Sequence, residues 1–132
     1  MRGADVMQES MFTTVILEHY VPKDHPLRPI RELFNEALKK LNGLFESIYA
    51  EGGRDSIAPE KLLRAQLLQV LYSIRSERLL VEQLRYNLLF RWFVGLAIED
   101  EVWNHSTFSK NRDRLLEQAV IPELFEEVVK LA

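Results

Sequence analysis

The side chains best suited to chemistry or binding lie at the start of one polar helix near the end of the chain. The sequence predicts a helix from Thr107 to about Gln118, with Ser106 as its N-cap. The segment carries hydroxyl, amide and basic groups, at Ser106, Thr107, Ser109, Lys110, Asn111 and Arg114. Such groups hydrogen-bond to phosphate oxygens and base edges, and the backbone N–H groups of a helix N-terminus assist them. The spacing permits nucleic-acid contact, but an ordinary solvated face is the more common origin of such a pattern.

The same helix separates into two faces when successive residues are placed about 100° apart. Phe108, Leu115 and Leu116 cluster on one side, and Ser106, Lys110, Asp113 and Arg114 point away from it. Arg112 falls near the apolar side. We therefore expect Arg112 to pair with an acidic residue such as Glu77 or Glu82, and not to contact DNA.

The sequence contains no recognisable self-contained active site. Its histidines, His19, His25 and His105, are far apart, and none has a metal-ligand partner at helical spacing. No glycine-rich phosphate loop follows a strand, and the absence of cysteine excludes disulfides and thiolate metal sites. We expect no catalytic residue, no metal ligand and no cofactor in this chain.

Composition and length indicate one globular domain. The chain has 132 residues, of which 47% are apolar, enough for a single hydrophobic core. Neither a signal peptide nor an apolar run long enough to span a membrane is present, so a cytoplasmic, nucleoid-associated location is expected.

The charge is unevenly distributed, which matters more than the net charge of −3. A negative total argues mildly against nucleic-acid binding. Between Glu60 and Trp92, however, basic residues outnumber acidic ones by six to three. The basic residues of this segment are Lys61, Arg64, Arg75, Arg78, Arg85 and Arg91. Of these, Arg75, Arg78 and Arg85 are the candidates for phosphate contacts.

Hydrophobic periodicity predicts an all-α fold of about six helices, with residues 1–24 as an extended N-terminal segment and residues 25–132 as the helical domain. Met11–Leu17 is β-branched and apolar, which favours an extended conformation or a small strand. The predicted helices are Arg28–Leu41 closed by Asn42–Gly43, Leu44–Tyr49 stopping at Gly52–Gly53, Ala58–Ile74, Glu77–Asn87 capped by Ser76, Thr107–Gln118, and a last helix opened by Pro122. A dense aromatic run ending at Gly95 follows the fourth of these helices. Phe90, Trp92, Phe93 and Trp103 sit among leucines and are expected in the core. Short turns between the helices from Ala58 to Gln118 are typical of helix-turn-helix domains.

Three stretches resemble the N-terminal domain of insertion-sequence-five-type bacterial transposases, which belong to the Asp-Asp-Glu superfamily. They are HPLRPIR (25–31), EKLLRAQLLQVLYSIRSERLLVEQLRYNLLFRWFVGL (60–96) and VWNHSTFSKNRDRLL (102–116). Together they cover nearly the whole chain in the family's order. Asn104 is a departure, because the family usually has Asp there. Asn still caps a helix but brings no charge.

The resemblance implies a DNA-binding domain that recognises the terminal inverted repeats of an insertion element. It also implies that the Asp-Asp-Glu catalytic domain, with its two divalent metals, follows this one in relatives. The chain is accordingly expected not to cut or join DNA by itself. Its expected partners are double-stranded DNA and a second copy or an intact transposase. The alternative is a helical dimerisation module, for example an inhibitory transposase fragment.

Overall fold

The computed structural model describes residues 2–7, 12, 14–49, 57–117 and 120–131, and eight helices lie within them. These helices are α1 (Leu17–Tyr20), α2 (Leu27–Lys40), α3 (Asn42–Tyr49), α4 (Pro59–Leu71), α5 (Glu77–Tyr86), α6 (Leu88–Val94), α7 (His105–Glu117) and α8 (Val120–Leu131). The described residues contain no strand, so the predicted all-α class is confirmed, with more helices than the six or so expected. None of these helices is both long and apolar enough to cross a membrane.

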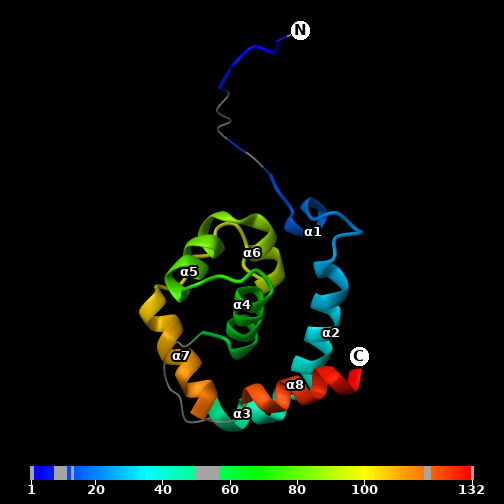
Figure 1. The fold of residues 1–132 in the computed structure, drawn as a ribbon, viewed down its shortest axis with the longest axis vertical. Coiled ribbons are helices and arrows are strands. Elements are labelled where there is room, and N and C mark those ends of the chain that lie inside the picture. The colour runs from blue at the N-terminus through cyan, green and yellow to red at the C-terminus, as the bar shows by residue number, and fades with distance from the viewer. Residues whose placement is uncertain (1, 8–11, 13, 50–56, 118–119, 132) are drawn as a thin grey trace.

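Helix α4 lies at the centre of the molecule (Figure 1). It packs against α5, α6 and α7, while α2 packs against α3 and α8, and α8 also meets α7. Residues 2–7 lie away from the helices, as Figure 1 shows. This arrangement makes α4 the element that positions α5 and α7, the two helices that carry most of the predicted binding residues.

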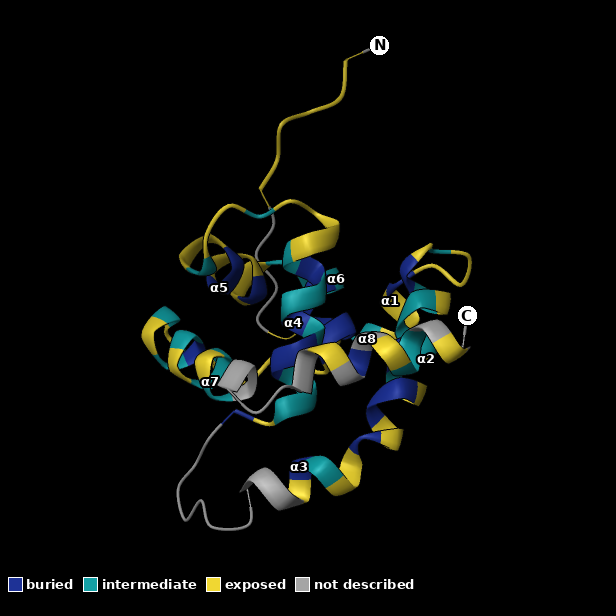
Figure 2. Ribbon diagram, turned by 60° about the horizontal axis from the view of Figure 1, so that its bottom comes forward, coloured by how far each residue is buried: buried dark blue, intermediate teal, exposed yellow. Residues whose placement is uncertain are grey.

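The core is formed by the inward faces of these helices (Figure 2). Its completely buried side chains include Ala37, Leu62, Ala65, Leu68, Leu80, Leu84, Phe93, Val94 and Phe108. The core position expected for the aromatic run is confirmed, because Phe90, Trp92 and Phe93 are at most 5% exposed. Trp103 packs against the core while remaining partly buried.

Helix α4 ends at Leu71, three residues earlier than predicted. Ser73 adopts a left-handed conformation with φ of 51°. The N–H of Ile74 then donates to the carbonyl of Gln69 at 2.9 Å, and that of Ser73 to Val70 at 3.3 Å. This is the hydrogen-bond pattern of a Schellman helix end, which usually needs glycine at the left-handed position. Val70, in the last turn of α4, is 72% exposed.

Two other predicted helix ends are confirmed and one is wrong. Ser76 caps α5 by accepting from the N–H of Leu79, and Gly95, with φ of 96°, ends α6. The Asn42–Gly43 cap was wrong: Leu41 turns the chain without a left-handed residue, and α3 begins at Asn42. The stop at Gly52–Gly53 lies outside the described residues.

The N-terminal segment does not remain extended up to residue 24. It is helical over Leu17–Tyr20, and α1 packs against α6. Val21 is 2% exposed and belongs to the core. The described positions of Met11–Leu17 before α1 contain no strand. Part of the segment predicted to be extended is therefore helical and packs against α6.

Candidate nucleic-acid interface

Five arginines are engaged inside the protein and are unsuited to contacting a ligand. They are Arg28, Arg31, Arg64, Arg91 and Arg112. Arg64 donates to Asn35 Oδ1 at 2.8 Å and to the carbonyl of Val94 at 3.2 Å, and burial lowers its pKa. Arg91 is 6% exposed and donates to the carbonyls of Ala97 and Asp100 in the loop before α7. Two of the six basic residues between Glu60 and Trp92, Arg64 and Arg91, therefore serve the fold.

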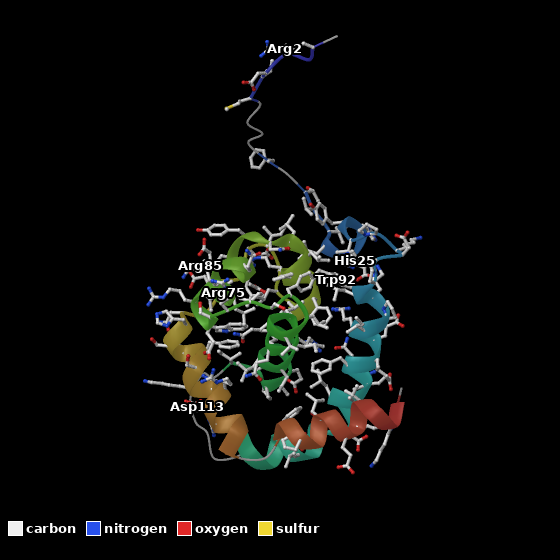
Figure 3. The ribbon with its side chains drawn as sticks, viewed as in Figure 1. Arg2, His25, Arg75, Arg85, Trp92 and Asp113 are labelled. Carbon is white, nitrogen blue, oxygen red and sulfur yellow. The ribbon has the colours of Figure 1, made fainter. Side chains whose placement is uncertain are left out.

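Trp92 of α6 joins α6 to α1 and α2 through a cluster of charged groups (Figure 3). Its ring lies 5.0 Å from the guanidinium carbon of Arg28 and 4.7 Å from that of Arg31. Its Nε1–H donates to Glu18 Oε2 at 2.7 Å, and Glu18 forms an ion pair with Arg28. Arg28 also donates to the carbonyls of Pro22, Glu18 and Val21. Cation–π contacts and these hydrogen bonds thus hold α1 to the domain.

The pKa of Glu18 is lowered, first by the hydrogen bond from Trp92 and then by Arg28. A lowered folded-state pKa stabilises the protein above the unfolded-state pKa, about 4.3 for glutamate, and this stabilisation disappears as the pH falls through the folded value. We expect Glu18→Gln to reduce stability at neutral pH, and the difference from the unmodified protein to shrink on acidification. Urea midpoints measured across this pH range test the expectation. A difference that stays constant with pH would contradict it.

Helix α7 is fixed against α5 by Glu77. The Glu77 carboxylate forms an ion pair with Arg112 and accepts a hydrogen bond from the Ser109 hydroxyl. The predicted pairing of Arg112 with an acidic residue on α5 is therefore confirmed, with Glu77 as the partner. The Ser109 hydroxyl faces α5, because its hydrogen bond goes to Glu77, and its oxygen also lies 2.9 Å from the carbonyl oxygen of His105.

The predicted cap of α7 was wrong by two residues. Asn104 Oδ1 accepts from the N–H of Thr107 at 2.8 Å, which makes Asn104 the capping side chain. Ser106 is exposed in the first turn. Because α7 begins at His105, two residues earlier than a cap at Ser106 implies, His105 and Asn104 come close to α5.

The predicted binding residues divide into exposed and engaged groups. Those that are exposed are Arg75, Arg78, Arg85, Ser106 and Lys110. Arg75 and Arg85 both belong to the region of α5 in Figure 3. Thr107, Asn111 and Arg114 belong to the engaged group. The carbonyl of Thr107 accepts a hydrogen bond from the side-chain amide of Asn111, and Arg114 is partly buried and interacts within the protein. The exposed Asp113 also lies on α7, as expected, and offsets part of this positive charge.

A groove of about 320 Å³ separates α5 from the start of α7. Its lining residues are Arg78, Val81, Glu82, Arg85, Tyr86, Asn104 and His105. The first five come from one face of α5, since they recur at spacings of three, four and seven. Arg78 Nη2 lies 3.1 Å from His105 Nε2, so a lining residue of α5 contacts one of α7. The groove can therefore offer guanidinium groups, an amide, an imidazole and an aromatic ring to one ligand.

The described residues contain no cluster of acidic, histidine or cysteine side chains that could hold a metal ion. A family model described as a transposase domain (DUF772) matches residues 15–114. The chain belongs to this transposase domain family. No curated protein and no solved structure matches it significantly.

The matched part of this transposase domain, residues 15–114, includes the three features described above. It begins two residues before α1 and ends within α7, so the contacts of Trp92, the Glu77 ion pair and the groove all fall inside it. Sequence reasoning did not select Tyr86 and His105 as site residues of the transposase domain. The spacing on α5 could have indicated Tyr86, which follows Arg78 by eight residues on the same face.

Proposed function

We propose that this transposase domain is the N-terminal DNA-recognition domain of an insertion-sequence-five-type transposase, and that it binds the terminal inverted repeats of the element. The observation that carries the proposal is the set of exposed cations on two adjoining helices. Arg75, Arg78 and Arg85 lie on or just before α5, and Lys110 lies on α7. Membership of a transposase family supports DNA as the ligand.

In this proposal α7 serves as the recognition helix of a helix-turn-helix-like unit. Ser106 and Lys110 are exposed near its N-terminus, where the partial positive charge of the helix favours phosphate. Arg78 and Arg85 contact the DNA backbone and set the position of α7. Thr107, Asn111 and Arg114 contribute at the edge of the contact, while Ser109 supports α7 through Glu77.

The proposed role of this domain in transposition is binding, with no catalytic residue and no cofactor of its own. Strand cleavage and joining are assigned to an Asp-Asp-Glu domain with divalent metal ions, as the resemblance implies. Binding is therefore expected in the presence of a metal chelator.

The unmodified protein is expected to bind labelled duplexes carrying the element's terminal repeats more tightly than duplexes of shuffled sequence. With three or four phosphates neutralised, log affinity should fall against log salt with a slope of about −3 to −4. Fluorescence anisotropy at several salt concentrations measures both quantities. Equal affinity for repeat and shuffled duplexes would contradict recognition of the repeats, and a flat salt dependence would contradict the phosphate contacts.

A second candidate function is a helical interaction module that pairs with another copy or with an intact transposase. It is favoured by an apolar hollow lined mainly by Phe34, Leu63, Leu67, Val70 and Leu124, beside the exposed end of α4. Sedimentation without DNA separates the two candidates. A stable dimer that fails to bind any duplex selects the interaction module.

A further inference from the structure

The groove between α5 and the start of α7 has a composition that differs from a simple phosphate-binding surface. We propose that it binds a short unpaired stretch at the end of a DNA duplex, with one base stacked on Tyr86 and phosphates on either side of that base held by Arg78 and Arg85. This inference rests on the proposed function and specifies the form of DNA that the domain prefers.

Tyr86 offers a large aromatic surface for stacking. It is 76% exposed, although it lies at the end of α5 beside a groove lined by two arginines. Every base presents a flat π face, so an exposed ring next to cationic groups is the usual arrangement for binding single strands. Inside a duplex each base is already stacked on both of its faces, so the ring would find no free face there.

The carboxylate of Glu82 favours an unpaired base in the groove over a continuous run of phosphates. It lines the groove between Arg78 and Arg85, one turn of α5 from each. A phosphate placed beside this carboxylate would be repelled. A base in the same place has no net charge, and its amino group can donate a hydrogen bond to a carboxylate. The order of charges along α5 therefore matches phosphate, base and phosphate.

The size of the groove agrees with a short stretch of single strand. Its volume of about 320 Å³ lies at the lower end of ligand pockets, which are roughly 300–1,000 Å³. Arg78 and Arg85 are separated by seven residues of helix, a rise of about 10 Å. That distance corresponds to about three nucleotides at the 3.4 Å spacing of one strand.

The test compares a blunt duplex with the same duplex carrying about three unpaired nucleotides at one end, a length set by the spacing of the arginines. Anisotropy titrations use the full chain and its Tyr86→Ala and Tyr86→Phe variants. The unmodified protein should bind the extended duplex about tenfold more tightly. Tyr86→Ala should abolish this preference while leaving affinity for the blunt duplex unchanged, and Tyr86→Phe should keep it.

Two controls separate stacking from other effects. Tyr20→Ala removes another exposed tyrosine, 57% exposed on α1, and should keep the preference. Abasic units in the extension retain the phosphates but remove the bases, and should abolish it. A preference that survives either Tyr86→Ala or abasic substitution overturns the inference, as does equal affinity for blunt and extended duplexes.

Failure of this inference is distinguishable from failure of the proposed function. Blunt-duplex binding that favours the repeats but does not respond to the extension retains the proposed function and rejects the groove. Binding of a single-stranded oligonucleotide that depends on Tyr86, without any binding of the repeat duplex, supports the groove and rejects the proposed function. Absence of binding to all three DNAs rejects both.

Discussion

Trp92→Ala is expected to lower the free energy of unfolding by about 3–5 kcal/mol, the usual cost of truncating a large buried aromatic side chain. Trp92 is 5% exposed, and its removal leaves a cavity between α6 and the first two helices. It also removes the hydrogen bond to Glu18 and the aromatic face beneath two guanidinium groups. Small domains have a total free energy of unfolding of about 5–15 kcal/mol, so this substitution would remove a large part of the domain's stability.

Urea unfolding followed by circular dichroism measures this effect. Trp92→Phe is the matched control, because it retains an aromatic ring for the cation–π contacts but cannot donate to Glu18. Trp92→Phe should lower the free energy of unfolding less than Trp92→Ala does. Adding Glu18→Gln should lower it less in the Trp92→Phe variant than in the unmodified protein. A loss below about 1 kcal/mol for Trp92→Ala, in the range of ordinary surface substitutions, would show that α1 is not held by this cluster.

The positions of the helices were predictable because they depend on local periodicity, whereas several of their ends were not. The spacing of apolar residues located α2 within one residue of its observed bounds. Ser73 illustrates the opposite case: serine carries no strong signal for a left-handed conformation, yet it ends α4. Asn42–Gly43 carries such a signal, but the chain turns at Leu41 instead. Tertiary packing decided both ends.

The candidate site was predictable to the extent that a single helix determines it. The helical periodicity placed Arg112 near the core side of α7, and this was enough to anticipate its ion pair with Glu77. The cluster around Trp92 could not be anticipated in this way. Glu18 and Trp92 are separated by 74 positions in the sequence, and nothing local to either residue indicates the other.

The excess of basic residues between Glu60 and Trp92 shows why a count of charges in the sequence overestimates the number of cations available to DNA. Arg64 and Arg91 contribute to the surplus between Glu60 and Trp92, but both donate inward to carbonyl groups of the fold. Arginine suits this role because its planar fork holds several acceptors at once. The electrostatic case for DNA binding therefore depends on the fewer cations that remain exposed, and a charge-reversal experiment should target those.

Arg78→Glu combined with Arg85→Glu is expected to weaken binding to any duplex about 100-fold and to reduce the salt slope by about two, because two phosphate contacts are lost. Both side chains are exposed, so the fold should persist, and circular dichroism verifies this.

The matched control is Lys39→Glu combined with Lys40→Glu, which makes the same change in net charge on α2, at side chains 78% and 50% exposed. If the contacts are local to α5, anisotropy titrations should show a much smaller loss for the control and an unchanged salt slope. Equal weakening by both pairs would mean that overall charge, and not the surface formed by α5 and α7, governs the interaction. The net charge of the protein is already −3, so attraction of DNA by the overall charge is the weaker explanation of binding. We therefore expect the α5 pair to lose affinity for DNA and the α2 pair to lose little.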